Sequence, residues 1–239
     1  MPNLQFPYRV VEPALATSYG IPEAARESGF RSMLNNLQKL GVLGEAARGG
    51  RGAPLVYTPL ELHRLVVAIE LCELGVPPAT TAALIANYWE SHLKAICRDA
   101  ERNNPAVRGG ERIDPGDDVL LYLGGVSLRT GSLKGARSPS IPNINRCKLR
   151  DLPRHIVLWM KMDPDDNPVD LPPRALVVNL SARLRTFHAA LLRPYMDELR
   201  TQHAAGQAKK SRIARRAGGR TTRKPKLKPR PAARLGEGK

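Results

Sequence analysis

Glycines and prolines divide residues 19–104 into short segments with apolar residues at helical spacing, which favours a compact set of helices. A short helix is expected from Pro22 to Glu27, with Gly29 ending it. A second helix is expected over residues 31–40, closed by Gly41. Its buried stripe is predicted to consist of Met33, Leu34, Leu37 and Leu40.

Two longer helices are predicted to follow. Thr58-Pro59-Leu60-Glu61 has the pattern of a capping box, so a helix should begin there and run to about Leu74, before Gly75. Its apolar face is predicted to hold Leu62, Leu65, Val66, Ile69 and Cys72. The next helix should run from Pro78 to about Arg102, with Ile85, Trp89, Leu93 and Ile96 on one stripe. That stripe would pack either on the rest of the chain or on a second copy.

The remaining parts of the first hundred residues are read as an arm and a hairpin. Pro2, Pro7 and Pro13 interrupt residues 1–18, which are therefore predicted to form an extended arm. Residues 42–57 place a glycine-rich stretch between two short apolar ends, the pattern of a β-hairpin. Arg48 and Arg51 would lie at its tip, where they suit phosphates or a minor groove.

Burial of Leu34 and Leu37 would leave a polar face on the second helix. The side chains on it are Arg31, Ser32, Asn35, Asn36, Gln38 and Lys39. Asparagine and glutamine amides can make bidentate contacts to adenine, and arginine to guanine, so this face has the chemistry for reading bases in the major groove. A solvated helix surface carries similar residues, and the basic hairpin is what favours DNA here.

The order of helix, turn, helix, basic hairpin and helix over residues 19–85 resembles the N-terminal winged helix-turn-helix of MerR-family transcriptional regulators. Ile21–Gly29 (IPEAARESG) is similar to the family's first helix and turn, and Gly41–Leu43 to its Gly-Leu-Leu. Val56–Ile85 resembles its Tyr-Ser/Thr strand end, acidic-capped helix and Glu-Leu-Gly turn. The family's Arg-Tyr-Tyr-Glu is replaced here by Asn35-Asn36-Leu37-Gln38. The resemblance implies double-stranded DNA as a partner and a homodimer through residues 78–102.

Residues 105–207 are predicted to form a small α+β region of unknown role that could hold a partner, an effector or a second copy. Apolar runs at Val119–Leu123, Ile156–Met160 and Ala175–Val178 are read as strands of a sheet covered on both faces. A helix is expected from about Ala182 to His203.

The positive charge is concentrated at the end of the chain. Residues 208–239 hold 13 of the 38 Lys and Arg residues and one acid, Glu237, so they carry +12 of the net +16. They have too few large apolar residues for a core and are predicted to be disordered. Phosphate contacts are expected from Lys209, Lys210, Arg212, Arg215, Arg216, Arg220, Arg223, Lys224, Lys226, Lys228 and Arg230. A solubilising or ribosome-directed tail remains an alternative.

Other classes of function find little support in the sequence. No apolar run is long enough for a membrane helix, and the N-terminus lacks the secretory pattern, which favours a cytoplasmic, nucleoid-associated protein. The three cysteines form no C-x-x-C pair. The five histidines, His63, His92, His155, His188 and His203, have no metal-ligand spacing. The sequence therefore predicts no metal, no cofactor and no enzyme.

The predicted fold is mainly α with a winged helix-turn-helix over 19–104, then an α+β region over 105–207 and a disordered tail over 208–239. The predicted function is that of a double-stranded DNA-binding transcriptional regulator, with the winged helix giving specificity and the tail giving affinity. One alternative is a structural or mobile-element DNA-binding protein, acting in packaging, replication or partition. A second is a metal-dependent nuclease within 105–207.

Overall fold

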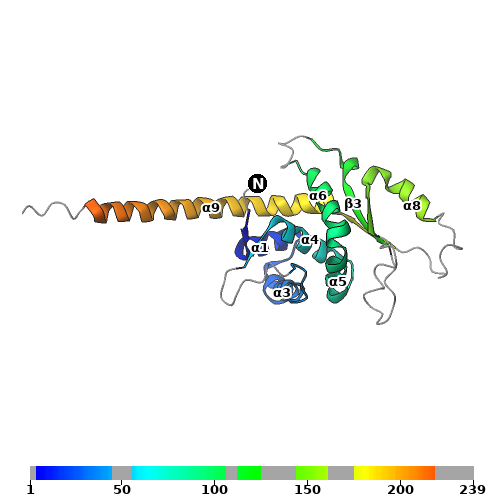
Figure 1. Cartoon of the computed structure of the whole chain (residues 1–239), viewed down its shortest axis with the longest axis horizontal. Helices are drawn as coiled ribbons and strands as arrows, with labels where there is room; N and C mark the ends of the chain where they lie inside the picture. The colour runs from blue at the N-terminus through cyan, green and yellow to red at the C-terminus, as the bar shows by residue number, and fades with distance from the viewer. Residues whose placement is uncertain (1–3, 45–54, 106–111, 125–143, 161–174, 219–239) are drawn as a thin grey trace, which may run out of the picture. The chain divides into compact units, whose positions relative to one another are not determined.

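The computed structural model describes residues 4–44, 55–105, 112–124, 144–160 and 175–218, which are mostly helical (Figure 1). Residues 1–195 form one compact unit and residues 196–239 a second. The boundaries predicted at residues 18 and 104 both fall inside the first unit. None of the described helices is both long and apolar enough to cross a membrane.

The elements follow one another in this order: β1 (Phe6–Pro7), α1 (Tyr8–Ser18), α2 (Glu23–Ala25), the π-helical η1 (Arg26–Phe30), α3 (Arg31–Lys39), β2 (Val56–Tyr57), α4 (Pro59–Glu73), α5 (Pro78–Tyr88), the π-helical η3 (Trp89–Leu93), α6 (Lys94–Arg102), the 3₁₀ turn η4 (Pro115–Asp117), β3 (Val119–Gly124), β4 (Ile144–Lys148), the 3₁₀ turn η5 (Leu149–Asp151), α8 (Leu152–Met160), β5 (Ala175–Asn179) and α9 (Leu180–Gly218).

The extended arm predicted for residues 1–18 is wrong, because residues 8–18 form the helix α1. Pro13 lies inside this helix and removes one backbone donor. Burial of Val11 (1% exposed) and Leu15 (0%) in the core offsets that loss, since a fully buried aliphatic side chain contributes about 1.5–3 kcal/mol. Tertiary packing thus overrides the helix-breaking tendency of the proline.

The turn predicted at Gly29 is also wrong. The chain stays helical from Glu23 through α2, η1 and α3 to Lys39, and Gly29 lies within the π-helical η1. Gly29 does not adopt the positive φ that ends a helix, while its neighbour Phe30 is buried in the core (5% exposed). The tight turn lies earlier, between α1 and α2.

Three helix ends share one geometry. After α1, Gly20 has a φ of +64°, and the N–H groups of Ile21 and Gly20 donate to Ala16 and Thr17. This is a Schellman motif, in which a left-handed residue lets the chain turn back on the last helical carbonyls. Gly41 after α3 and Gly75 after α4 have φ values of +85° and +83° and end their helices in the same way, as predicted.

The first strand of the hairpin predicted over 42–57 is wrong, because residues 42–43 do not form a strand. Val42 and Leu43 lie in a turn, and both are buried in the core. The strand β2 instead pairs antiparallel with β1, matching Phe6 with Tyr57. The predicted tip, with Arg48 and Arg51, lies outside the described residues.

The capping box predicted at Thr58 is confirmed. The Thr58 hydroxyl accepts the Glu61 N–H at 3.3 Å, and a Glu61 carboxylate oxygen accepts the Thr58 N–H at 2.6 Å. The predicted apolar face is also confirmed for Leu62, Leu65 and Ile69, which are fully buried, whereas Cys72 is half-buried.

Removing the cap should measurably weaken the fold. Thr58→Ala is expected to lower the free energy of unfolding by about 1 kcal/mol, because the Glu61 N–H loses its acceptor. Urea denaturation followed by circular dichroism measures the change. Thr186→Ala, whose exposed hydroxyl only donates to the Ala182 carbonyl in α9, is the control and should change stability by less than about 0.5 kcal/mol. Equal losses in the two variants would contradict this role of Thr58.

The long helix predicted over 78–102 is confirmed as α5, η3 and α6 in succession. Its apolar stripe of Ile85, Trp89, Leu93 and Ile96 is buried inside this chain, with 1–4% of each residue exposed. These side chains therefore pack in the chain's own core. A homodimer through 78–102 stays a prediction, and it would have to use other side chains of this segment.

The sheet in the α+β region is antiparallel, in the order β4-β3-β5. Strands β3 and β5 were predicted, whereas β4 was not, because its sequence INRCK contains little apolar character. Every residue of β3 is buried, while β4 and β5 each expose part of their residues. Only the central strand therefore has the two covered faces that were predicted for the sheet as a whole.

The strand predicted at Ile156–Met160 is wrong, because these residues end the helix α8. A short apolar run fits a buried strand and a buried helix equally well. Here Pro153 occupies the second position of α8, where its ring and its missing N–H are tolerated in a helix. The helix contacts β4 and η5.

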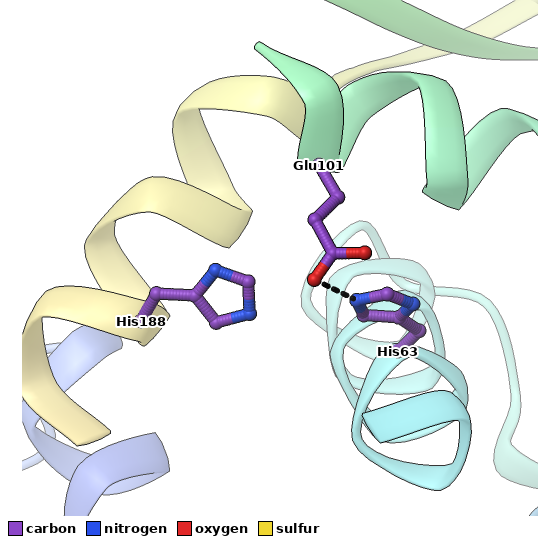
Figure 2. A group of neighbouring side chains, drawn as sticks. All are labelled: His63, Glu101 and His188. Carbon is purple, nitrogen blue, oxygen red and sulfur yellow. Dashed lines mark ion pairs between the residues drawn. The ribbon is translucent and has the colours of Figure 1, made fainter. Parts of the chain in front are cut away.

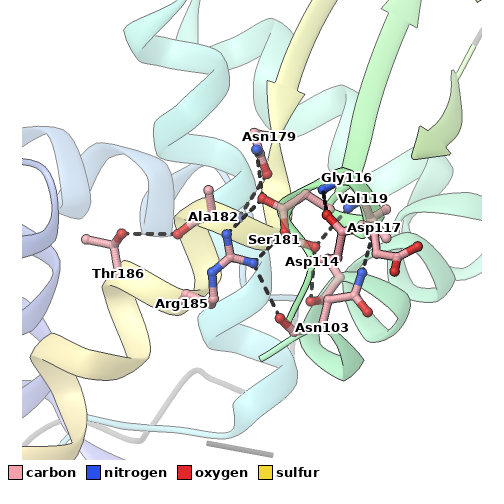
Figure 3. A network of polar contacts seen from close by, with 12 residues as sticks. Asn103, Asp114, Gly116, Asp117, Val119, Asn179, Ser181, Ala182, Arg185 and Thr186 are labelled. Atoms are coloured by element: carbon pink, nitrogen blue, oxygen red, sulfur yellow. Dashed lines mark hydrogen bonds and ion pairs between the residues drawn. The ribbon is translucent and has the colours of Figure 1, made fainter. Parts of the chain in front are cut away.

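A polar network joins β3, β5, α6 and α9 (Figure 3). Asp118, just before β3, accepts two hydrogen bonds from the Arg185 guanidinium at 2.6 and 2.8 Å and one from the Asn179 amide at 3.0 Å. The buried Ser181 hydroxyl accepts the Val119 N–H and donates to the Ala100 carbonyl. The network thereby fixes the start of α9 against the sheet and α6.

Helix α9 begins where it was predicted but ends later. Its first turns bury Leu180, Leu184, Phe187 and Leu191 in the first unit, and the helix then continues to Gly218. The tail predicted to be disordered from residue 208 is therefore helical over 208–218, a stretch rich in Ala, Lys and Arg, which favour helices. Residues 219–239 lie outside the described part of the chain.

Candidate nucleic-acid interface

The outer face of α3 carries four of the six residues that were predicted to read bases. Leu34 and Leu37 are buried (1% and 0% exposed), while the opposite face exposes Ser32, Asn35, Asn36 and Lys39. We call these four exposed side chains the α3 polar face. Helix α3 also contacts α5 (Figure 1). The hydroxyl and the two amides thus face solvent on a helix that is fixed from behind.

Two other predicted contacts, Arg31 and Gln38, have partners within the chain. The Arg31 guanidinium lies 3.4 Å from a Glu12 carboxylate oxygen and 3.7 Å from one of Glu27. The Gln38 amide donates to the Tyr57 hydroxyl at 2.6 Å, which ties α3 to β2. Both side chains would have to give up these contacts to reach a nucleic acid.

Glu12 on α1 forms ion pairs with the helical segment that contains α3. Its carboxylate is buried (2% exposed) and accepts two hydrogen bonds from Arg26, at 2.7 and 2.9 Å, in addition to the ion pair with Arg31. The hydrogen bonds from Arg26 hold the pKa of Glu12 below its usual value, although burial acts in the opposite direction. One carboxylate therefore fastens α1 to both η1 and α3.

The remaining predicted contacts are cations outside this face. Arg48 and Arg51 fall in the segment 45–54, and Arg220, Arg223, Lys224, Lys226, Lys228 and Arg230 fall in 219–239, both outside the described residues. The backbone of α9 includes Lys209, Lys210, Arg212, Arg215 and Arg216. On the α3 polar face itself, Lys39 is the charged residue, and the other cations predicted to contact phosphates belong to these other segments.

A polar hollow of about 520 Å³ lies between the end of α6 and the α+β region, where a partner or an effector was predicted. Its lining includes Asp99, Arg102, Arg146 and Lys148. These side chains are already paired within the chain: Asp99 with both Arg102 and Arg146, and Lys148 with Asp117 at 2.9 Å. The hollow therefore offers a ligand few charges that are not already compensated.

Two features that position α3 do not follow from the sequence pattern. Glu12 falls in the predicted extended arm, which gives no reason to expect its pairing with residues 14 and 19 positions further along. Gly20 and Pro22 form the usual pattern at a helix end and mark the turn between α1 and α2, whereas Gly29, where the turn was predicted, lies inside a helical segment.

Comparisons of this chain with protein-family models, with curated proteins and with solved structures found no match.

Proposed function

We propose that this protein binds double-stranded DNA and that α3 is the helix that reads the bases. The observation that carries the proposal is the α3 polar face, which presents one hydroxyl, two amides and one ammonium group on a helix that Arg31 and Gln38 tie to α1 and β2. Amides of asparagine can pair with the edge of adenine in the major groove, and hydroxyls can contact several bases. Helix α1 and the turn at Gly20 take the place of the first helix and turn of a helix-turn-helix.

The elements around α3 support a winged arrangement. The chain leaves α3, passes through residues 45–54 and returns as β2, which pairs with β1 at the start of α1. In winged helix-turn-helix proteins such as those of the MerR family, a loop in this place contacts the DNA backbone. Arg48 and Arg51 would make such contacts here, and the basic segment 208–239 would add phosphate contacts that carry no sequence information. A role as a nucleoid-associated transcriptional regulator is part of this proposal.

Replacing both amides of the α3 polar face tests the proposal. The full chain is expected to enrich a preferred sequence from a pool of random duplexes. Asn35→Ala/Asn36→Ala should reduce discrimination by about 1–3 kcal/mol for each lost bidentate contact, while binding to random DNA persists. Selection from the random pool, followed by affinity measurements on the preferred and a scrambled duplex, gives both quantities.

Asn145→Ala is the matched control, because Asn145 is an exposed asparagine on β4, away from α3. It should leave both the selected sequence and the affinity unchanged. Unaltered selection by the Asn35/Asn36 double variant would show that α3 is not the reader. Wild-type protein that coats duplexes without selecting any sequence would instead favour the structural or mobile-element alternative.

A further inference from the structure

Three helices of the first unit bring two histidines and a glutamate together. His63 lies on α4, Glu101 on α6 and His188 on the first part of α9, and all three side chains point toward one another (Figure 2). One possible ligand atom from each residue lies within 4.8 Å of the other two. The closest pair is the His63 Nε2 atom and a Glu101 carboxylate oxygen, 3.8 Å apart. We call this group the HEH cluster.

His63 has an unusual environment for a core residue. It is 2% exposed, yet neither of its ring nitrogens has a hydrogen-bond partner. A buried polar atom without a partner costs about 1–3 kcal/mol, so buried side chains of this kind are almost always paired. The 3.8 Å separation from Glu101 is too long for a hydrogen bond. An ion bound between the His63 ring and the Glu101 carboxylate would give the ring nitrogen the partner that it lacks.

We propose that the HEH cluster binds one Zn²⁺ ion, with His63, Glu101 and His188 as its protein ligands. Two histidines and one glutamate are an established ligand set for zinc when a fourth position is left to water or another ligand. Ligand atoms on a tetrahedral zinc are separated by about 3.3 Å, given bonds of about 2.0–2.1 Å. Small side-chain rotations would bring the three ligand atoms from their present separations to that value. This site is independent of the proposed DNA binding.

The protonation states of the two rings suit this role. Burial, followed by the nearby His188 and Arg98, lowers the pKa of His63 to about 4, and burial lowers the pKa of His188 as well. Burial therefore favours the neutral form of both rings, which is the form that binds metals. Burial also raises the pKa of Glu101, although the nearby Arg98 acts in the opposite direction.

Asn104 is placed to orient one ligand. Its side-chain amide lies 2.7 Å from the Nδ1 atom of His188, and the residue is buried (4% exposed). An amide can present its oxygen as readily as its nitrogen, and the oxygen would accept a hydrogen bond from a protonated Nδ1. That tautomer leaves Nε2 of His188 with its lone pair available for the metal. Histidine ligands of zinc are usually oriented by such a second hydrogen bond.

Metal titrations of the full chain, prepared without a histidine tag and stripped with a chelator, test the proposal. We expect one Zn²⁺ per chain and visible absorption from Co²⁺ bound by nitrogen and oxygen ligands. At a Zn²⁺ concentration 100 times Kd, Tm should rise by about 5–10 °C, whereas Mg²⁺, which prefers oxygen ligands, should leave it unchanged.

Glu101→Gln is the decisive variant, because it removes the ligand charge with little change in shape at a side chain that is one-third exposed. It should weaken Zn²⁺ binding by at least about tenfold, the change seen even for outer-shell partners of metal ligands. His188→Gln should abolish the rise in Tm, and His92→Gln, at a histidine outside the cluster, should retain it. Wild-type protein that binds no Co²⁺, or a full Zn²⁺ response in Glu101→Gln, would overturn the proposal.

Discussion

Replacing Asp118 with Asn is expected to lower the free energy of unfolding by about 3 kcal/mol. The Asp118 side chain is buried (3% exposed) and forms an ion pair with Arg185 through two hydrogen bonds, with a third from Asn179. Breaking a buried pair by removing one charge costs about 3–5 kcal/mol, because the other charge is left without compensation. Arg185 is 27% exposed and can regain part of its hydration, which favours the lower end of that range.

The pH dependence of this loss has a definite sign. Burial alone would raise the pKa of Asp118, but the hydrogen bonds from Arg185 and Asn179 outweigh it and hold the pKa below the usual 3.8. A carboxylate with a lowered pKa stabilises the fold fully above its unfolded value and loses that contribution as the pH falls through its folded value. The difference between wild-type protein and Asp118→Asn should therefore be constant near neutral pH and shrink below about pH 4.

Urea denaturation at several pH values measures both effects. Asp197→Asn is the control, because Asp197 forms an exposed pair with Arg200 (61% and 76% exposed). Such surface pairs contribute about 0–1 kcal/mol, so the control should be close to wild type. A loss of under 1 kcal/mol in Asp118→Asn would mean that the network in Figure 3 does not hold the start of α9.

Removing residues 208–239 is expected to weaken binding to every duplex and to make the affinity less sensitive to salt. These residues carry +12 of the net +16, and each phosphate contact releases a condensed counterion. Log affinity changes with log salt by about 0.9 for each contact, so the loss of six contacts would make the slope shallower by about 5. The ranking of DNA sequences should stay nearly unchanged, since phosphate contacts do not report sequence.

The measurement is the affinity of full-length and truncated chains for a preferred and a random duplex over a range of salt concentrations. A second variant, with Lys209, Lys210, Arg212, Arg215 and Arg216 replaced by Gln, keeps the full length and isolates the charges carried by α9. It should lie between the other two. Equal salt slopes in all three proteins would show that this segment does not contact DNA. A changed sequence preference would show that it takes part in base reading.

Local signals predicted part of the fold well. The capping box at Thr58 and the turns at Gly41 and Gly75 form hydrogen bonds with residues close by in the sequence. These helix ends can therefore be recognised without the rest of the chain. The stripe from Ile85 to Ile96 could be recognised because the helical spacing of apolar residues is also a local signal. What the stripe packs against depends on distant segments, and there the sequence left two alternatives open.

The errors arose where tertiary packing decides the outcome. Pro13 indicated an arm, yet the burial of Val11 and Leu15 keeps α1 helical. The HEH cluster was missed because its members come from three helices and lie 38 and 87 positions apart along the chain. Metal-ligand spacing is informative only when ligands share one helix or loop. On α3, Leu34 and Leu37 are buried as the helical period predicts, whereas Leu40, predicted to be buried with them, is 41% exposed at the end of the helix. The partners of Arg31 and Gln38 could not be foreseen.

The pairing of Glu12 with Arg31 has a consequence for how the protein would search a genome. With Arg31 compensated, the α3 polar face holds, apart from Lys39, hydroxyl and amide groups whose contacts with bases depend little on ionic strength. The phosphate contacts made by the basic segment would depend on ionic strength steeply. Higher salt would therefore lower the affinity for random DNA more than it would lower the ratio of affinities for preferred and random sequences. Under the proposed function, the ratio of preferred to random binding would change far less with the ionic conditions of the cell than either affinity alone.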